Sequence, residues 1–296
     1  MALLASGSLW ALASAFLWAC AVILFALAGE SVPPGALNLF KGIVALVIFV
    51  PLVALTTTDL TLGWPARTWG MLALSGVVGI AVADTLYFMS LNRLGAGLEA
   101  VVSCLYFPLI AVAARLFLHE ALPPTTVAGG SLVVAGILVG SVGTTAGRSG
   151  RTQVWTGVAL GVLALVAMAA GVVVMQPIVS REPILWTTTV RLAAGTAVLL
   201  PVVWWGRDRA VFLRLTRPSP LWRHALPGAV VGGALSMLAW IAGFALTEAT
   251  RAAILNQMST IFVFVLAVVV LREPLTRRRV AAVVLAFAGA ALVIAG

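Results

Sequence analysis

The fold is decided by the stretch Leu94–Val142, LGAGLEAVVSCLYFPLIAVAARLFLHEALPPTTVAGGSLVVAGILVGSV, because the chain repeats it at Thr247–Ala295. The second copy begins 153 residues after the first and aligns with it without a gap. In each copy a short polar hinge, containing Glu120 or Glu273, separates two apolar runs. Chance identity between apolar runs is the alternative, but the hinge glutamates also align, which favours an internal duplication. The residues that recur in the second copy are Ala96, Ala100, Val112, Ala114, Leu118, Glu120, Leu122, Val127, Ala128, Leu132, Ala135 and Gly136.

The composition indicates an integral membrane protein. Of the 296 residues, 62% are hydrophobic and only 9% are charged, whereas soluble domains carry roughly 25% charged residues. The net charge of +9 comes from basic residues gathered in short loops. That distribution is typical of membrane proteins, so we expect a lipid bilayer rather than nucleic acid as the partner. The two cysteines, Cys20 and Cys104, lie in apolar runs and predict neither a disulfide framework nor a metal site.

A membrane-spanning helix needs about 20 predominantly apolar residues, and ten stretches of the chain meet this requirement. Backbone groups in hydrocarbon must be satisfied within the segment, so we expect an all-α protein. The duplication extends over the chain and predicts two repeats of five helices, residues 1–146 and 147–296. Because five is odd, the second repeat enters the membrane in the opposite orientation, which makes the repeats inverted. The predicted helices cover residues 6–28, 34–55, 69–91, 95–117, 124–142, 154–175, 183–204, 225–246, 249–271 and 277–295.

Inverted repeats are typical of secondary transporters, in which exchange of the conformations of the two halves opens one central site to alternate sides. This architecture favours transport over a duplicated membrane scaffold without transport activity. No ATP-binding motif occurs in the sequence, so we expect uphill transport to be driven by an ion or substrate gradient. A passive channel or facilitator stays open as an alternative, because only saturation of flux or counterflow distinguishes it from a carrier.

The arrangement resembles the drug/metabolite transporter superfamily, and its EamA-type branch in particular. The resemblance rests on the two five-helix halves, the Leu17-Trp18-Ala19 segment, a basic residue in the second helix of each half, and the glutamate after helices 4 and 9. The chain departs from the family pattern at His119 and Arg272, which stand where a glycine usually precedes the glutamate. The resemblance implies a multi-pass protein of the bacterial inner membrane that exports a small metabolite, an amino acid or a drug-like compound.

Two carboxylates inside predicted spans, Asp84 and Glu99, are the first candidate site residues. A charge within a span costs at least ~2.5–3.5 kcal/mol on insertion scales, so its retention indicates a function or a specific partner. Burial favours the neutral form of a carboxyl, because the charged form loses solvation. We therefore predict that Asp84, supported by Glu99, is the proton-coupling element. A nearby Lys41 or Arg191 would instead make Asp84 a fixed counter-charge, and a purely structural polar contact is the third interpretation.

Polar and aromatic side chains at helical spacing predict the walls of a binding cavity. Helix 4 presents Glu99, Ser103 and Tyr106 at i, i+4 and i+7, and helix 9 presents Asn256 and Ser259 at matching positions. Interhelical hydrogen bonds and core packing are the alternatives. We expect a cavity between helices 1, 3, 4, 6, 8 and 9, with helices 5 and 10 at the periphery or at a homodimer contact. The predicted substrate-binding residues are Trp10, Ser14, Trp18, Asp84, Tyr87, Glu99, Ser103, Tyr106, Met168, Trp240, Asn256 and Ser259.

Four other charged residues are predicted to be structural. Lys41 and Arg191 occupy equivalent places about two turns into helices 2 and 7, and snorkelling toward the membrane interface is the favoured interpretation for both. Glu120 and Glu273 stand at helix boundaries. A carboxylate there can cap the N-terminus of the next helix and interact favourably with its dipole.

An enzyme is disfavoured because the sequence offers no catalytic constellation. The two histidines, His119 and His224, lie at loop positions, and neither metal-ligand spacing nor a phosphate-binding loop occurs. We therefore expect a small-molecule substrate and neither a cofactor nor a metal.

The loop arginines predict which way the chain is inserted. Four lie in loops on the same side as the termini, namely Arg67, Arg115, Arg181 and Arg251. Twelve lie on the other side, namely Arg93, Arg148, Arg151, Arg207, Arg209, Arg214, Arg217, Arg223, Arg272, Arg277, Arg278 and Arg279. The positive-inside rule places both termini outside the cytoplasm, whereas the EamA-type resemblance implies termini inside it.

Overall fold

The computed structural model describes residues 7–56, 63–117, 124–141, 151–247 and 249–295, and within these ranges it is helical and contains no strand. The first repeat comprises α1 (Gly7–Gly29), α2 (Pro34–Thr56), α3 (Ala66–Gly76), η1 (Val77–Val82), α4 (Ala83–Leu94), α5 (Ala96–Ser103), α6 (Tyr106–Phe117) and α7 (Pro124–Ser141). The second comprises α8 (Arg151–Val179), α9 (Ile184–Trp204), α10 (Arg209–Leu215), α11 (Trp222–Gly228), η3 (Ala229–Ser236), α12 (Met237–Leu246), α13 (Ala249–Asn256), α14 (Met258–Val269) and α15 (Arg277–Ala295).

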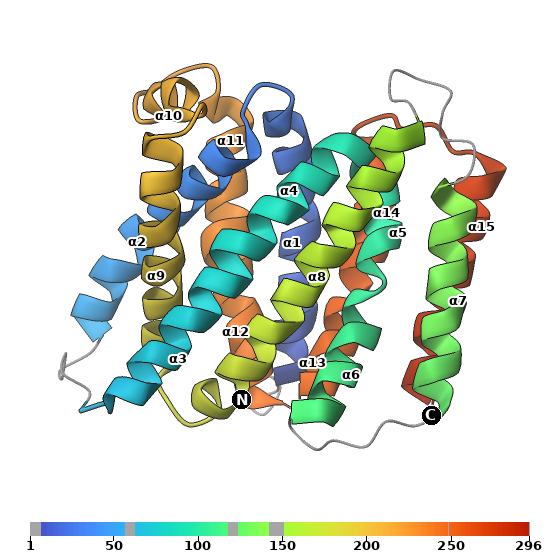
Figure 1. The fold of residues 1–296 in the computed structure, drawn as a ribbon, viewed down its shortest axis with the longest axis horizontal. Helices are drawn as coiled ribbons and strands as arrows, with labels where there is room; N and C mark the ends of the chain where they lie inside the picture. Colours follow the sequence, from blue (N-terminus) through green and yellow to red (C-terminus); the bar gives the residue numbers. More distant parts are fainter. Residues whose placement is uncertain (1–6, 57–62, 118–123, 142–150, 248, 296) are drawn as a thin grey trace.

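Counted across their bends, the described elements correspond to the ten predicted spans, in the same order and within a few residues of the predicted limits. Seven helical stretches of the described residues, three of which join consecutive elements, are long and apolar enough to cross a membrane, and α14 is a shorter apolar helix. The N- and C-termini lie at the same end of the molecule, and α8 begins at the opposite end from α1 (Figure 1). The prediction of an all-α membrane protein with inverted repeats is therefore confirmed. The short helix α10, between spans 7 and 8, was not predicted.

Irregularities of the backbone recur at equivalent places in the two repeats. The third span of each half contains a π-helical segment, η1 or η3, and these segments stand 153 residues apart within one residue at either end. The fourth span breaks between α5 and α6 at Cys104, and the ninth breaks between α13 and α14 at Gln257, again 153 residues later. The duplication therefore extends to local distortions of the helices, which are frequent at functional sites.

The two halves interleave instead of forming separate bodies. Helix α1 of the first half packs against α12 and α14 of the second half. Helix α8, the equivalent of α1, packs against α4 and α6 of the first half, which are the equivalents of α12 and α14. The second spans, α2 and α9, pack against each other, and so do the fifth and tenth spans, α7 and α15. The pair α7 and α15 stands at one edge of the bundle (Figure 1). This agrees with the peripheral position expected for helices 5 and 10, and the homodimer contact stays a prediction.

Glycine permits the closest helix crossings next to the interior. A Cβ atom built on Gly76, at the end of α3, would overlap the main-chain carbonyl oxygen of Arg191 in α9. A Cβ atom on Gly195, one turn further along α9, would lie 2.9 Å from the carbonyl oxygen of Gly76. Spans 3 and 7 therefore touch through their backbones. This crossing fixes the position of Arg191 along the span, so that its side chain lies beside the π-helical segment η1.

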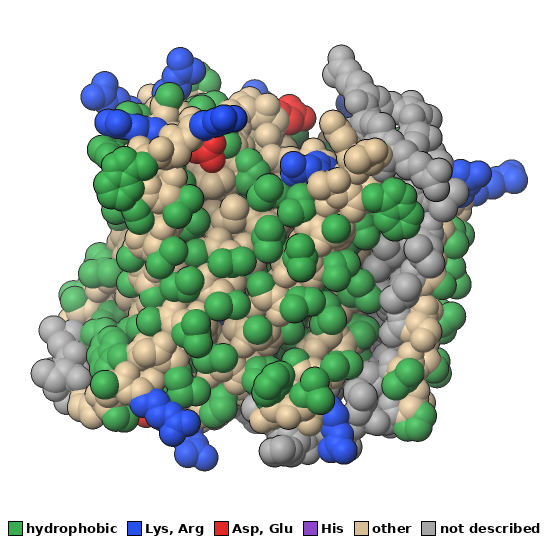
Figure 2. All heavy atoms as spheres, in the orientation of Figure 1, with side chains coloured by type: hydrophobic (Ala, Val, Ile, Leu, Met, Phe, Trp, Pro, Cys, Tyr) green, Lys and Arg blue, Asp and Glu red, His purple; other side chains and the backbone are tan. Residues whose placement is uncertain are grey.

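The outer surface has the distribution of side chains that a bilayer requires. Apolar side chains cover the face shown in Figure 2, and arginine side chains gather at the two ends of the spans. The indole Nε1 of Trp64 donates a 2.7 Å hydrogen bond to Glu182 at one end, and the Trp64 ring packs against Trp69 and Trp186. Tryptophan prefers the membrane interface because its ring is apolar and its N–H is polar. The chain is a multi-pass membrane protein.

Candidate functional site

A cavity lies between the two repeats, near the middle of the spans. It contains about 830 Å³ of atom-free space, part of which is open to the outside. Helices α1, α4, α5 and α6 of the first half line it with η1, and α8, α9, α12, α13 and α14 of the second half line it with η3. The lining residues are Ser14, Trp18, Gly79, Ile80, Asp84, Tyr87, Ser103, Tyr106, Leu165, Met168, Arg191, Gly232, Ser236, Met237, Trp240, Asn256, Gln257 and Ser259.

Most of the predicted substrate-binding residues line this cavity, and two do not. Trp10 lies near the start of α1 with 37% of its surface exposed. Glu99 is fully buried outside the cavity lining. The predicted residues that do line the cavity are Ser14, Trp18, Asp84, Tyr87, Ser103, Tyr106, Met168, Trp240, Asn256 and Ser259. The structure brings these side chains together, and their role in binding a substrate stays a prediction.

Sequence reasoning missed one wall of the cavity and several apolar positions. Span 7 was not among the predicted walls, yet α9 contributes Arg191. Hydropathy gave no signal for Ile80, Leu165 and Met237, because an apolar residue in an apolar span looks the same on a cavity wall as in the lipid-facing surface. The π-helical segments η1 and η3 supply Gly79, Gly232 and Ser236 to the lining. No sequence pattern distinguished those segments from regular α-helix.

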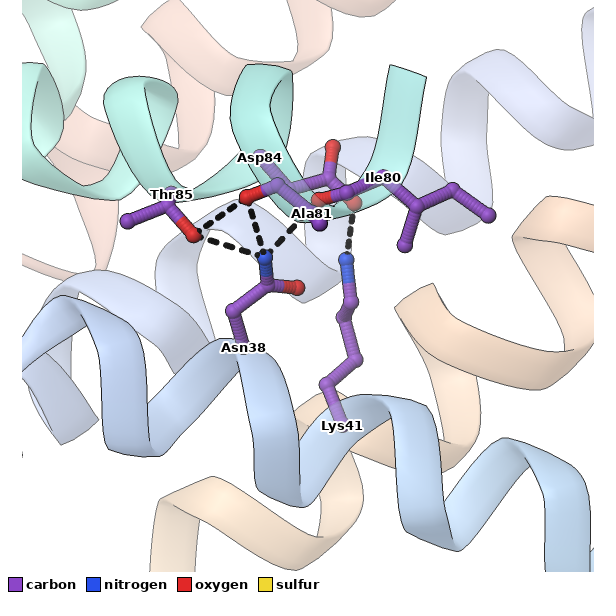
Figure 3. Close-up of polar contacts among 6 residues, drawn as sticks. All are labelled: Asn38, Lys41, Ile80, Ala81, Asp84 and Thr85. Carbon is purple, nitrogen blue, oxygen red and sulfur yellow. Dashed lines mark hydrogen bonds and ion pairs between the residues drawn. The ribbon is translucent and has the colours of Figure 1, made fainter. Parts of the chain in front are cut away.

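Asp84 and Lys41 form a buried ion pair at the start of α4. The Lys41 side chain extends from α2 toward the Oδ2 atom of Asp84, and 1% of the lysine side chain and 5% of the aspartate side chain are exposed (Figure 3). The Lys41 ammonium also lies 5.4 Å from the centroid of the Phe88 ring. A buried charge is tolerated when it is paired. Lys41 therefore supplies the counter-charge that the helix of Asp84 lacks.

Asn38 compensates for the irregular backbone beside this pair. One helical turn before Lys41, its Nδ2 donates hydrogen bonds to the carbonyl oxygen of Ile80 at 2.8 Å and to Oγ1 of Thr85 at 3.0 Å (Figure 3). The Thr85 hydroxyl donates to the carbonyl oxygen of Ala81 at 2.6 Å. A π-helical turn leaves carbonyl groups without their regular partners, and these side chains satisfy them. Asn38 was not predicted, although an asparagine within an apolar span was the available signal.

The snorkelling interpretation is wrong for Lys41 and Arg191. Each residue is 1% exposed. Neither side chain reaches the membrane interface, because Lys41 ends at Asp84 and Arg191 ends beside the central cavity. Long basic side chains snorkel when the interface is within reach and no interior site receives them. Here the interior offers a carboxylate to one and a polar cavity to the other.

Arg191 lies over an aromatic ring, and no carboxylate of the described residues forms an ion pair with it. Its Cζ atom is 5.5 Å from the centroid of the Trp240 ring, within the range of a cation–π interaction. Its Nε and Nη1 atoms are buried without a hydrogen-bond partner in the part of the chain that the structure describes. Trp240 in turn donates from Nε1 to the hydroxyl of Tyr106 at 3.2 Å, which joins α12 to α6 across the cavity.

Glu99 lies between α5 and α8, where glycine makes room for it. Its Oε2 atom is hydrogen-bonded to the hydroxyl of Ser90, which also lies 2.8 Å from the carbonyl oxygen of Gly157. A Cβ atom on Gly161 would come within 3.3 Å of Oε2. The Oε1 atom has no partner among the described residues. The predicted polar stripe of helix 4 is therefore divided, with Ser103 and Tyr106 facing the cavity and Glu99 facing helix α8.

The polar groups at the broken spans hold the two repeats together beside the cavity. Gln257, at the break between α13 and α14, donates from Nε2 to the carbonyl oxygen of Ser103 at 3.3 Å and to Oγ1 of Thr260 at 3.0 Å. On the other side of the cavity, the hydroxyl of Ser14 in α1 donates to the carbonyl oxygen of Ser236 in η3 at 3.2 Å. The contacts Gln257–Ser103 and Ser14–Ser236 each join an irregular segment of one repeat to the other repeat.

Glu273 caps the N-terminus of a helix in the other repeat. Its carboxylate accepts hydrogen bonds from the backbone N–H groups of Ala96 at 2.9 Å and Gly97 at 3.2 Å, at the N-terminus of α5. The sequence predicted a cap on the next helix, α15, and that contact stays a prediction. The contact with α5 has a simple cause: α5 begins beside the hinge after Gly95, whose φ is 75°, and its first N–H groups have no partner within the helix. Glu120, its counterpart, lies outside the described residues.

The described residues contain no group of three or more His, Cys, Asp or Glu side chains that could hold a metal ion. The cavity therefore presents one ion pair, one further cation, hydroxyl and amide groups, and aromatic rings. This set can bind a small polar or amphipathic molecule.

Comparison with known proteins agrees with this architecture. The family model described as "EamA-like transporter family" matches twice, over residues 5–142 and 155–295. No significant match was found among curated protein sequences. One crystal structure of a protein is similar to this chain with a TM-score of 0.72 and 17% sequence identity, and the alignment covers 97% of this chain and 95% of that one. That likeness shows the fold, and the two family matches span nearly the whole sequence, so the chain belongs to the EamA-like transporter family and is a membrane transporter of the drug/metabolite transporter type.

Proposed function

We propose that the chain is a secondary transporter that exports a small metabolite, amino acid or drug-like compound by alternating access. The observation that carries this proposal is the cavity between the two inverted repeats, which both halves line with polar and aromatic groups. In transporters built from inverted repeats, the site lies at the repeat interface near the bilayer midplane, and irregular helices border it. The elements η1 and η3 border the cavity here, and so do the breaks at Cys104 and Gln257.

Alternating access requires two arrangements of the same helices. The inverted repeats supply them, because each half can adopt the conformation of the other. The paired irregular segments are the places where a span bends without breaking a long run of backbone hydrogen bonds. The contacts Ser14–Ser236 and Gln257–Ser103 each join the repeats at such a segment. We propose that these contacts rearrange when the cavity changes the side to which it opens.

We further propose that a proton gradient drives the export, with Asp84 and Glu99 as the coupling carboxyls. Asp84 is paired with Lys41 and lines the cavity, so its protonation would break an ion pair at the binding site. Hydrogen-bond accounting supports Glu99 as well. The Ser90 hydroxyl has one proton but two acceptor neighbours, Glu99 and the carbonyl of Gly157. A protonated Glu99 donates to Ser90, and Ser90 then donates to Gly157, so both contacts are satisfied.

The test is transport by the full-length protein reconstituted into sealed lipid vesicles. A panel of amino acids, cationic dyes and organic acids is screened for counterflow, in which unlabelled substrate inside the vesicle drives uptake of labelled substrate. A carrier shows saturable counterflow with at least one compound, and a pH gradient then drives net accumulation. Flux that does not saturate and shows no counterflow would identify a passive channel. Absence of flux for the whole panel, with the protein folded in the vesicles, would leave a membrane scaffold.

A further inference from the structure

The two repeats carry a basic residue at equivalent positions, but the partners of the two side chains differ. Lys41 in α2 and Arg191 in α9 stand 150 residues apart, and both are buried. Lys41 finds its carboxylate in the next span, at Asp84. The residue equivalent to Asp84 in the second repeat is Met237, which also lines the cavity but carries no charge. The second half therefore carries the cation but no carboxylate at the position equivalent to Asp84.

No carboxylate among the described residues forms an ion pair with Arg191, although the charge of Asp84 attracts it from the other repeat. The carboxylate of Asp84 is already paired with Lys41. Glu99 lies outside the cavity lining and is bound to Ser90. Arg191 is left with two buried nitrogen atoms that have no hydrogen-bond partner, and it faces the cavity. A buried cation without a partner is costly, so an anion that enters the cavity gains a favourable contact.

We propose that the transported compound carries a carboxylate, which Arg191 binds, and an apolar or aromatic body, which lies against the rings of the cavity. This inference rests on the proposed transport function, since it names the substrate class of the same cavity. Guanidinium matches a carboxylate because its N–H groups are planar and bind both oxygens together. A single unpaired cation fits a single negative charge, which favours a monocarboxylate over a phosphate ester.

The other lining residues are compatible with such a compound. Trp240 lies under the guanidinium in the second repeat, and in the first repeat Trp18 contacts Tyr87 with ring centroids 5.6 Å apart. Met168 and Leu165 line the same cavity from α8. Asp84 also faces the cavity, but its charge is balanced by Lys41, so it does not exclude an anion. The cavity thus combines an anion-binding end with aromatic and aliphatic walls.

The experiment measures equilibrium binding to the full-length protein in lipid nanodiscs. The probes are 3-phenylpropionate, its amide and 3-phenylpropylamine, together with decanoate, decanamide and decylamine, so that one body carries three different head groups. We expect the carboxylates to bind at least about tenfold more tightly than the amides of the same body. Arg191→Met should remove this preference, and Arg191→Lys should keep part of it, because lysine retains the charge but loses the planar fork. Equal affinity for carboxylate and amide, or a preference that survives Arg191→Met, would overturn the proposal.

Two controls separate the possible failures. Arg209→Met removes another arginine that lies over a tryptophan, with its Cζ 4.7 Å from the Trp204 ring centroid, but Arg209 is exposed at the start of α10, outside the cavity. It should leave the preference for carboxylates unchanged. Counterflow in vesicles is measured on the same variants. Saturable counterflow of a neutral or cationic compound without any carboxylate preference would contradict the substrate class and keep the transporter. Carboxylate binding without counterflow would keep the anion site and contradict transport.

Discussion

Asp84 and Met237 occupy equivalent positions in the two repeats, in the first turn of the α-helix that follows a π-helical segment, and both line the central cavity. Only Asp84 carries a charge, and it is neutralised by Lys41. The site is therefore asymmetric, although the scaffold around it is symmetric. Transport needs two conformations that the symmetric scaffold can supply, whereas binding and coupling depend on the residues at which the repeats differ.

Asp84→Asn should abolish gradient-driven transport and destabilise the protein. The substitution leaves the Lys41 ammonium buried without its counter-charge, and removal of one partner of a buried pair typically costs about 3–5 kcal/mol. We expect a lower melting temperature, loss of accumulation against a gradient, and partial survival of substrate exchange in vesicles. A variant that accumulates substrate like the parent would show that Asp84 is only a packing contact.

The double variant Lys41→Met with Asp84→Met distinguishes coupling from folding. Methionine already stands at the equivalent of Asp84 in the second repeat, at Met237. Replacement of a whole buried pair by apolar residues is often neutral for stability. The double variant should therefore regain most of the lost melting temperature while its transport stays independent of the pH gradient.

Glu99→Gln should be far milder for folding than Asp84→Asn. Glutamine is close in size to glutamate, and its amide can donate to Ser90 as a protonated carboxyl does. No cation is left without a partner by this change, because no ion pair to Glu99 occurs among the described residues. We expect a melting temperature near that of the parent and transport that no longer responds to pH. Unchanged pH dependence would assign Glu99 a structural role.

Gly76→Ala should disrupt the crossing of spans 3 and 7. The added methyl group would overlap the carbonyl oxygen of Arg191, and backbone cannot move aside as a flexible side chain does. Overpacking costs about 1–3 kcal/mol or more. Gly70→Ala in the same helix is the matched control, because nothing lies within 4 Å of its added Cβ. We expect a lower yield of folded protein and a displaced Arg191 for Gly76→Ala alone, measured by size-exclusion profile and thermal melting.

The spans and the repeat were predictable because they depend on composition and register. Hydrophobic length sets a membrane helix, and a gap-free repeat with an odd number of spans sets its inversion. The polar stripe of Ser103, Tyr106, Asn256 and Ser259 was predictable because polar residues in hydrocarbon need a reason. The stripe predicted which residues gather, and the structure places them around one cavity.

The direction of single charged side chains was not predictable in the same way. From their positions in the helices, the side chains of Lys41 and Arg191 could extend either to the membrane interface or into the interior. The residues of the neighbouring spans decide which of these directions a side chain takes. The partner of Lys41 is 43 residues away in α4, and the helix capped by Glu273 lies 176 residues before it. The π-helical segments η1 and η3 consist of small and apolar residues, which also form ordinary α-helix.

Glu273→Gln should lower stability and leave transport by the folded protein nearly intact. Its carboxylate accepts backbone hydrogen bonds at the N-terminus of α5, and loss of the charge removes a dipole interaction worth typically about 0.3–1 kcal/mol. Glu30→Gln is the control, because Glu30 lies in the exposed turn after α1 and caps no helix there. Thermal melting and counterflow are compared. Lost counterflow with an unchanged melting temperature would mean that the contact between the hinge and α5 takes part in gating. The same outcome is predicted for Glu120→Gln.

The final prediction concerns orientation, for which the charge distribution and the family resemblance disagree. The helices α10 and α11 lie at the end of the molecule opposite to both termini (Figure 1), and they carry the exposed residues Arg209, Arg214 and Arg223. The loops of that end hold most of the arginines of the chain, so the positive-inside rule places it in the cytoplasm and the termini outside.

Paired reporters decide this question, because green fluorescent protein fluoresces in the cytoplasm and alkaline phosphatase is active outside it. Each reporter is fused after Gly296 and, separately, inserted between α10 and α11, near Pro218. We expect phosphatase activity at the C-terminus and fluorescence at Pro218. The reverse pattern would place the termini in the cytoplasm and show that charge does not set the topology. Replacement of Arg207, Arg209, Arg214 and Arg217 by glutamine then tests the cause: if those charges hold this end inside, the variant should show mixed reporter activity, since fewer basic residues weaken the bias.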